Sequence, residues 1–461
     1  MLPFVNMSRD EENEYFADGL SEELLNVLSK IKGLRVAART SSFKFKGADV
    51  EIPVAAQKLG VAHVLEGSVR KAGKRVRITA QLVKASSDSH LWSETYNREL
   101  DDIFAVQDDI AQSVVQELRQ RLLGASADAS ANAAKVIADV QAASKGRSDN
   151  PEAFRLYLQG QFFRSHLTRD SLANAIECYE HALALDPDYA LAWAGLSRVA
   201  SDQAGQNWVP RDDGYEKARN AALKAIAFEP TLAEGHTALG WVLWAHDWNW
   251  TEAQASFNRA LELAPGSTLA INAAATLVGN LGNLDEAIGL FRRAVQLDPL
   301  NVSFNRNLGL YSLAAGLLDE AETALNRTLQ ISPQGGMTHC WRSLLRIAQG
   351  RLDEALADAK NESSEIFRLV ATAVVQFALN DRVASDAALT ELIETQGADS
   401  PYQVAEVFAA RDDADKAFEW LDRTYLDRDP GLSYMKMDPF LRPLRDDPRW
   451  RLLLDRMQMV G

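Results

Sequence analysis

The chain has 461 residues, of which 47% are hydrophobic and 25% charged, as in an ordinary soluble globular protein. Its length suffices for two or three domains or for one long repeat array. The net charge of -15 is uneven, with 17 Lys and Arg against 18 Asp and Glu in residues 1–125 and 32 against 46 in the rest. The later part therefore repels nucleic acid and anionic lipid as a whole, so no nucleic-acid partner is expected.

Residues 1–123 predict a small α/β domain. The opening LPFVN reads as the tail of a strand, so we expect the chain to be a fragment or a late-start reading frame. The residues of 18–21 are typical helix caps, and the apolar spacing from Leu24 to Ile31 predicts a helix that ends at Gly33. A short strand at 34–38 and a helix at 53–59 follow.

Residues 61–83 predict a β-hairpin around a Gly-containing turn, because apolar and polar residues alternate with period two on its second strand. A strand near 91–96 and a helix over 102–122 complete this domain. The hairpin carries a basic set, which could contact an acidic partner or could simply be a solvated surface that blocks edge pairing. Its members are Arg70, Lys71, Lys74, Arg75 and Arg77, with Lys44 and Lys46 nearby.

Residues 124–150 turn to Ala, Ser, Asp and Gly, which predicts a linker with some helical tendency. After Asn150, five prolines recur at intervals of 43, 35, 34 and 34 residues. Each closes a helix-length apolar pattern, as in LDEAIGLFRRAVQLDP. A period near 34 is the signature of stacked helical hairpins. The prolines are Pro187, Pro230, Pro265, Pro299 and Pro333.

Fixed offsets from these prolines carry small residues, which would let paired helices approach closely. Twelve residues before each proline stands an alanine, and five before it an alanine or, once, Thr328. Eight before it stands a large side chain in four of five units. Fainter copies extend to about residue 428, and residues 429–461 predict a cap over the last hairpin. Its apolar face would comprise Trp450, Leu453, Leu454 and Met457.

Residues 151–428, with this period, the alanine pairs and the closing prolines, resemble a tetratricopeptide repeat array. The amino-terminal segments EYFADGLSEELLNVLS and LGVAHVLEGSVRKAGKRVRITAQL are similar to the TolB-like domain that precedes such arrays in bacteria. That domain commonly follows a winged-helix DNA-binding domain or a class III adenylate cyclase domain. The resemblance implies a small α/β domain followed by an all-α superhelix (an α-solenoid), with protein–protein interaction and signal sensing as its function.

The sequence holds no phosphate-binding loop, nucleophile elbow or zinc helix, so neither an enzyme nor a metal or other cofactor is predicted. The acid pairs that begin several second helices are explained by the positive end of each helix. Cys178 and Cys340 would lie about five repeats apart, too far for a disulfide, so we expect free thiols and a reducing compartment.

A groove on the array is the predicted binding site for a peptide or protein partner. Aromatic, Arg and Asn side chains serve as anchors and backbone ligands in such grooves. Alternatively, the tryptophans only fill space around the long second repeat, and Trp248 and Trp250 favour that interpretation. Positions facing the groove would be Arg198, Trp241, Trp244, Asn272, Thr276, Asn280 and Arg306.

Three functional readings stay open. The first is a bacterial, cytoplasmic, non-catalytic regulatory scaffold. The second is the sensory part of an adenylate cyclase or winged-helix regulator whose output domain is absent, which could lie in the periplasm. The third, a hydrolase in the amino-terminal domain, lacks a visible nucleophile and base. The ligand and the oligomeric state cannot be predicted from the sequence.

Overall fold

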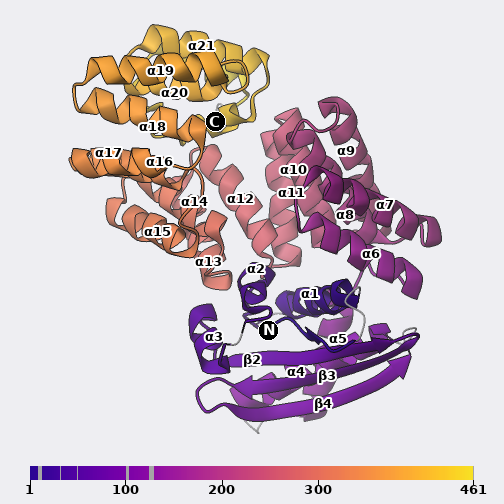
Figure 1. The fold of residues 1–461 in the computed structure, drawn as a ribbon. Coiled ribbons are helices and arrows are strands. Elements are labelled where there is room, and N and C mark those ends of the chain that lie inside the picture. The colour runs from indigo at the N-terminus through magenta and orange to yellow at the C-terminus, as the bar shows by residue number, and fades with distance from the viewer. Residues whose placement is uncertain (9–12, 32, 49, 100–102, 124–128, 460–461) are drawn as a thin grey trace. The chain divides into compact units, whose positions relative to one another are not determined.

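The structure is a computed structural model that describes residues 1–8, 13–31, 33–48, 50–99, 103–123 and 129–459. It is mostly helical, with a small sheet near the amino terminus (Figure 1). The chain divides into two compact units. Unit 1 comprises residues 1–273 and 296–299, and unit 2 comprises residues 274–295 and 300–461. A small α/β region followed by an all-α array confirms the predicted fold class.

The sheet has four strands in the order β1-β2-β3-β4: Val5–Asn6, His63–Ala72, Arg75–Lys84 and Ser89–Glu99. The first pair is parallel and the others are antiparallel. The predicted hairpin is β2–β3, turning at Gly73 with a positive φ. Val76 and Ile78 are buried while Arg75 and Arg77 are exposed, so the period-two pattern does separate a core face from a solvent face.

The described residues of this part of unit 1 form five α-helices, α1 Glu14–Lys30, α2 Arg39–Ser42, α3 Ile52–Leu59, α4 Ile103–Leu123 and α5 Ala129–Ala143, and a 3₁₀ turn at Phe43–Phe45. The predicted start of α1 is wrong, because Phe16 and Ala17 extend its apolar stripe one turn earlier. Ser21 is therefore no cap but a buried residue, whose hydroxyl accepts the Phe4 N–H at 2.9 Å and ties the β1 segment to α1. The predicted strand at 34–38 is also wrong, since those residues pair with no strand.

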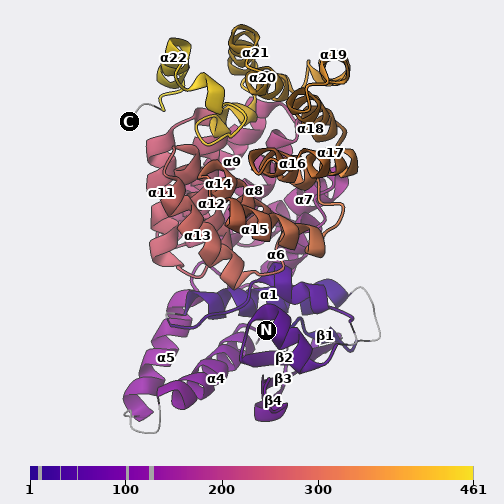
Figure 2. The same cartoon turned by 90° about the vertical axis from the view of Figure 1, so that its left-hand side faces the viewer.

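Helix α5 lies within the predicted linker 124–150, of which residues 124–128 fall outside the described part of the chain. It packs beside α4 (Figure 2) and against α1, and it buries Val136 and Val140 in the unit 1 core. This core continues into the first helical hairpins, where α1 packs on α6. The domain boundaries proposed from the sequence stay a prediction.

From residue 151 the described chain forms eight helical hairpins. Their first helices are α6 Pro151–Arg164, α8 Ala190–Gly205, α10 Ala233–Val242, α12 Thr268–Asn280, α14 Val302–Ala314, α16 Thr338–Ala348, α18 Glu365–Ala378 and α20 Pro401–Ala410. Their second helices are α7 Arg169–Leu185, α9 Arg211–Phe228, α11 Trp250–Leu263, α13 Leu284–Leu297, α15 Leu318–Ile331, α17 Leu352–Asn361, α19 Arg382–Gln396 and α21 Ala414–Leu426.

The five prolines all lie in the turns between hairpins, as predicted. The alanines at the two fixed offsets, and Thr328, are fully buried. Three of the large residues at the third offset, Tyr179, Phe257 and Leu325, pack against glycines of first helices. At Gly240, for example, an added Cβ would lie 2.4 Å from the Phe257 ring. Small residues therefore set the close helix approach on which the repeat depends.

Within each unit, neighbouring first helices pack on one another, as α8 does on α10 and α18 on both α16 and α20. Second helices of neighbouring hairpins make fewer contacts with each other. Because the first helices lie closer together than the second helices, the stack curves toward the first helices. The surface formed by the first helices is therefore its inner side. We call this face the first-unit inner wall (α6, α8, α10) and the second-unit inner wall (α14, α16, α18, α20).

The chain ends with two 3₁₀ turns, Pro430–Tyr434 and Arg442–Leu444, and with α22 Pro448–Arg456. Helix α22 packs on α21, where the Arg449 guanidinium lies 4.4 Å from the Phe418 ring centre. Of the four residues predicted as its apolar face, Trp450, Leu453 and Met457 are buried and Leu454 is half-buried.

Candidate functional site

The first-unit inner wall carries two arginines around one aspartate. Arg164 ends α6, and Arg198 and Asp202 lie one turn apart on α8. Asp202 receives the Nε atoms of Arg198 at 3.3 Å and of Arg164 at 3.5 Å. Both distances exceed the 2.7–2.9 Å typical of a tight charge-assisted bond. The group therefore has one excess positive charge and loose internal pairing.

Two tryptophans on α10 and its continuation lie beside these three charged residues. The Arg198 guanidinium lies 5.5 Å from the Trp241 ring, and the Trp241 and Trp244 rings are 4.6 Å apart. Arg198 Nη1 and Trp241 Nε1 are buried atoms that have no hydrogen-bond partner among the described residues. Burial lowers the pKa of Arg198, and the nearby Arg164 adds to that shift. We call Arg164, Arg198, Asp202 and Trp241 the inner-wall cluster.

A π-helical turn follows Trp241 on the helix that carries it. Helix α10 continues into a π-helical turn at Leu243–Asp247, and Trp248 follows with a φ of 55°. Arg219 of α9 binds Asp247 at 2.5 and 2.6 Å, which fixes that turn. Trp248 and Trp250 are buried, as the packing interpretation predicts. A π-helical turn in an α-helix is often found at functional sites.

Of the seven predicted groove residues, Arg198, Trp241, Asn272 and Arg306 are half-buried. The structure brings Arg198 and Trp241 together. Trp244, Thr276 and Asn280 are buried, and Asn280 Oδ1 accepts a 2.7 Å hydrogen bond from Tyr311 Oη. These three contribute to packing between hairpins, and a role for any of the seven in binding stays a prediction.

Arg306 lies on the second-unit inner wall in a different setting. Its Nη1 donates to the Gly336 carbonyl at 3.3 Å, and burial lowers its pKa. The Tyr434 side chain and the Glu362 carboxylate partly oppose that lowering of the pKa. Tyr434 belongs to residues 430–445, which we call the carboxy-terminal segment.

The carboxy-terminal segment covers the second-unit inner wall. Phe440 packs on Trp341 of α16 with ring centres 5.3 Å apart, and Arg442 Nη2 donates to the Ala314 carbonyl of α14 at 3.1 Å. Further residues of the segment are fully buried: Leu432, Met435, Met437, Leu441 and Leu444. This part of the predicted cap thus runs over first helices rather than only closing the last hairpin.

A buried pair of carboxyl groups joins this segment to α20. Tyr402 Oη donates to Asp438 Oδ2 at 2.8 Å, and Glu406 is hydrogen-bonded to the same aspartate. Burial raises the pKa of both carboxyl groups, and in Glu406 the Asp438 charge adds to the effect. Two carboxylates this close in an apolar setting favour sharing a proton.

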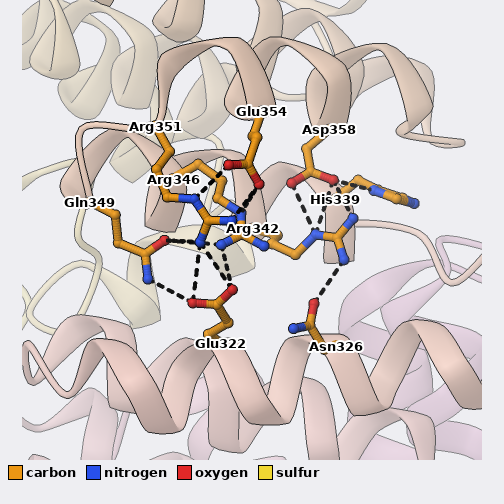
Figure 3. A network of polar contacts seen from close by, with 9 residues as sticks. All are labelled: Glu322, Asn326, His339, Arg342, Arg346, Gln349, Arg351, Glu354 and Asp358. Carbon is orange, nitrogen blue, oxygen red and sulfur yellow. Dashed lines mark hydrogen bonds and ion pairs between the residues drawn. The ribbon is translucent and has the colours of Figure 1, made fainter.

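Charges between α15, α16 and α17 are satisfied by one another (Figure 3). Asp358 accepts Arg342 Nε at 2.9 Å and His339 Nδ1 at 2.9 Å, while Arg342 Nη1 reaches Asn326 at 2.9 Å. Around Glu322, bonds from Gln349, Arg346 and Arg351 lower the pKa of its carboxyl group to about 2. Unlike the inner-wall cluster, this network serves hairpin stacking.

The predicted basic patch is divided by the strand alternation. Arg70 and Arg77 are cross-strand partners, with Arg75 on the same face of the sheet. Lys71 pairs with Val76 on the opposite face, where its Nζ lies 5.3 Å from the Phe16 ring. Lys74 is exposed in the turn. Whether the exposed arginines contact a partner stays a prediction.

A hydrogen-bond chain connects the α/β part of unit 1 to the first hairpin. Tyr157 Oη donates to buried Glu23 of α1 at 3.2 Å, and Gln161 links Tyr157 to Tyr179 at 2.8 and 2.9 Å. Burial raises the pKa of Glu23, and Arg147, 3.8 Å away, opposes that shift.

Three further observations bear on chemistry. Within the described ranges, no group of three or more His, Cys, Asp and Glu side chains could hold a metal ion. Both cysteines are free thiols, as expected, and Cys340 is buried. The described helices include none with the length and apolarity that crossing a membrane requires.

Sequence reasoning missed Arg164, Asp202 and the path of the carboxy-terminal segment. Asp202 could have been found, because it follows Arg198 by four residues on a first helix and so shares its face. Arg164 could not be placed in this way. It precedes Pro187, the first of the five prolines, and the groove positions were counted from those prolines.

Comparison with known proteins identifies the repeats. Residues 166–189 and 272–336 match models of the tetratricopeptide repeat. A Rhizobium meliloti protein named "Putative adenylate cyclase 3" is 37% identical over 244 residues, which are 53% of this chain and 39% of that protein. The chain thus spans well under half of that relative, and the TolB-like resemblance of its amino-terminal residues stays a prediction.

Solved structures are matched as well, each at low sequence identity. PilF of Pseudomonas aeruginosa is 18% identical, covering 46% of this chain and 97% of its own, with a TM-score of 0.37. A tetratricopeptide repeat protein from Parabacteroides merdae is 15% identical, covering 57% and 99%, with a TM-score of 0.41. Human IFIT1 is 15% identical, covering 71% and 87%, with a TM-score of 0.43.

Proposed function

We propose that this chain, which contains tetratricopeptide repeats, is a non-catalytic scaffold that holds a segment of another protein on its first-unit inner wall. The observation that carries the proposal is the inner-wall cluster. Arg198 and Trp241 combine a guanidinium, an aromatic face and two hydrogen-bond donors that the described chain leaves unpartnered. Trp and Arg are the residues over-represented in binding hot spots.

The second-unit inner wall is the weaker candidate for the same role. Its first helices are covered by the carboxy-terminal segment, and Arg306 is already hydrogen-bonded to Gly336. A partner there would have to displace buried apolar side chains, which costs free energy in proportion to the area exposed. The proposal therefore assigns the partner to unit 1.

Site-specific photocrosslinking tests this assignment in cells that express the full chain. A photoreactive residue at Gln206, exposed one turn after Asp202 at the end of first helix α8, should capture a distinct partner protein. The matched position Arg259, exposed on second helix α11, should not. Equal capture at both positions, or capture that survives Trp241→Ala in a variant of native helicity, would refute the proposal.

A second candidate function rests on the Rhizobium meliloti relative. We propose as the alternative that the chain is the regulatory part of a longer signalling protein, with its state passed on through the α/β part. The series of side-chain hydrogen bonds from Glu23 to Tyr179 would be one route of that coupling. Sequencing upstream of Met1 tests it. An in-frame cyclase or winged-helix domain would support the alternative, and a stop codon directly upstream would exclude it.

For localisation we propose the cytoplasm, with the periplasm as the alternative if an upstream membrane anchor exists. Two free thiols, one of them buried, suit a reducing compartment. Fractionation of cells expressing the chain from its native gene would distinguish the two.

A further inference from the structure

We propose that strand β4 is a dimerisation edge, at which a second copy of this chain adds its own β4 in antiparallel orientation. The inference goes beyond the proposed function, because it concerns the sheet of the α/β part and not the helical array. The second copy is identified by the sequence of β4, which is complementary to itself under a two-fold axis at Tyr96.

The sheet has two edges, and one of them is long. Strand β1, at one edge, has 2 residues, whereas β4, at the other edge, has 11 residues and is the last strand of the sheet in Figure 1. A long exposed edge strand is a template for pairing with another chain, and a short one is not. Strand β4 contains no proline, and the irregularity in its pairing with β3 lies outside residues 92–99.

The backbone groups that point outward from β4 follow from the alternation along each strand. Successive residues of a strand direct their N–H and C=O groups to opposite sides. In β2 the Val69 carbonyl accepts a bond from the β1 segment, so the even-numbered residues of β2 face β3. The registers of β2 with β3 and of β3 with β4 carry this alternation across the sheet. The backbone groups of Tyr96 therefore face β3, and those of Ser93, Thr95 and Asn97 face outward.

These outward groups are hardly used by the described part of the chain. Their one hydrogen bond among the described residues is the 3.1 Å bond from Arg98 Nη1 to the Asn97 carbonyl. This contact joins two neighbouring exposed residues, so water competes with it and a strand N–H could replace it. An antiparallel neighbour would supply partners for the whole row of groups.

The charges of β4 indicate what that neighbour is. Glu94 and Arg98 are exposed and lie two residues to either side of Tyr96. When two copies pair with Tyr96 opposite Tyr96, each Glu94 lies opposite the Arg98 of the other copy. Opposite charges directly across two strands stabilise the pairing, and like charges destabilise it. The strand therefore complements a second copy of itself.

The other symmetric registers centred within residues 94–98 lose this match. An axis at Thr95 or Asn97 places the two charges opposite uncharged residues, and an axis at Glu94 or Arg98 places like charges opposite each other. The Tyr96 axis pairs both charges. It also places Thr95 opposite Asn97, so that outward backbone groups meet outward backbone groups.

Sedimentation velocity of the full chain over a dilution series tests the proposal, and we expect a dimer that dissociates on dilution. Thr95→Pro removes an outward N–H and no bond to β3, and proline is tolerated at such positions of edge strands. This variant should be monomeric with the circular dichroism spectrum of the parent. The control Thr95→Val also loses the contact between the Thr95 and Thr79 hydroxyls but keeps the N–H, and should dimerise like the parent.

A charge exchange tests the register. Glu94→Arg and Arg98→Glu each place like charges opposite each other twice, and each should weaken the dimer about tenfold or more. One variant chain then carries two arginines at these positions and the other two glutamates, so a mixture of the two should form a dimer as strong as that of the parent. Lys74→Glu, a charge reversal in the exposed hairpin turn, should leave the dimer unchanged.

A parent chain that is monomeric throughout, a dimer that survives Thr95→Pro, or a mixture no stronger than either charge variant alone would overturn the proposal. If Thr95→Pro does not fold, the mixing experiment decides without it. None of these results depends on partner capture at Gln206 of the array, so the proposed function and the dimer can fail separately.

Discussion

The two inner walls are built from the same kind of helix but end in different states. The first-unit wall has a charged cluster whose donors are incompletely used. The second-unit wall is covered by the protein's own carboxy-terminal segment, with Phe440 stacked on Trp341. A repeat array thus offers binding surface only where its own chain has not already used it.

The same contrast holds for arginines. Arg342 in unit 2 binds Asp358 with both Nε and Nη2 and reaches Asn326 with Nη1. Arg198 in unit 1 has one long bond to Asp202 and an aromatic neighbour. We therefore expect unit 2 arginines to contribute stability and the unit 1 arginine to contribute binding.

The largest effect is expected from Phe440→Ala. Phe440 is 2% exposed, and removing a buried aromatic ring from a core costs about 3–5 kcal/mol. Denaturant unfolding followed by near-UV circular dichroism would measure the loss, and hydrogen exchange should rise in α14 and α16. The control Val383→Ala, at a side chain that is 83% exposed, should change little. Unchanged exchange would mean that the segment does not belong to the core of unit 2.

A matched pair of substitutions compares the arginines directly. Arg342→Gln should destabilise the chain by about 3 kcal/mol, because it leaves Asp358, which is 4% exposed, as a buried charge with one less partner. Arg198→Gln should cost less than about 1 kcal/mol, since it relieves the repulsion from Arg164. Thermal unfolding of both variants checks the difference, and equal losses would contradict the contrast between the walls.

Much of this could be predicted from the sequence. Local patterns with a fixed period predicted the helical hairpins and the buried face of the sheet. These patterns are the regular spacing of the five prolines, the alanines at fixed offsets such as Ala175, and the alternation of apolar and polar residues along β3. Segments without such a period were predicted less well, as at residues 34–38 and at the start of α1.

The candidate site was only partly predictable for a related reason. A repeat frame places Arg198 and Trp241 on first helices, but it cannot say which wall is covered. That depends on residues 430–445, which contact helices about 100 residues earlier and follow no period. Burial of Thr276 and Asn280 likewise depends on Tyr311 of the next hairpin.

The covered wall should also have its own pH dependence. The folded-state pKa values of Glu406 and Asp438 are raised, so their favourable contribution is present below the ordinary carboxyl pKa of about 4 and is lost as pH rises through the folded values. Glu406→Gln should remove part of that loss and gain about 1 kcal/mol at pH 8 relative to pH 5. Urea unfolding at both pH values tests this. A variant with the pH profile of the parent would show that the pair does not titrate as described.

The Glu322 carboxylate of unit 2 should respond in the opposite direction. Because its folded pKa is lowered to about 2, it contributes stability above the ordinary value near 4.5 and loses it as the pH falls toward 2. Glu322→Gln should therefore lower the free energy of unfolding between pH 5 and 8 without changing its slope there, and should flatten the fall in stability at acid pH.

The smallest change in stability is expected at the hydrogen bonds that join the α/β part of unit 1 to its first hairpin. Unit 2 has no such part among its described residues. Tyr157→Phe removes the hydroxyl between Glu23 and Gln161 and should cost about 1 kcal/mol. Tyr179→Phe removes the far end of the same chain. Since both bonds act through Gln161, the double variant should lose less than the sum of the two single losses, by about 0.5 kcal/mol or more. Strict additivity in denaturant unfolding would mean that the two tyrosines act independently, and the α/β part would then need another contact to sense the array.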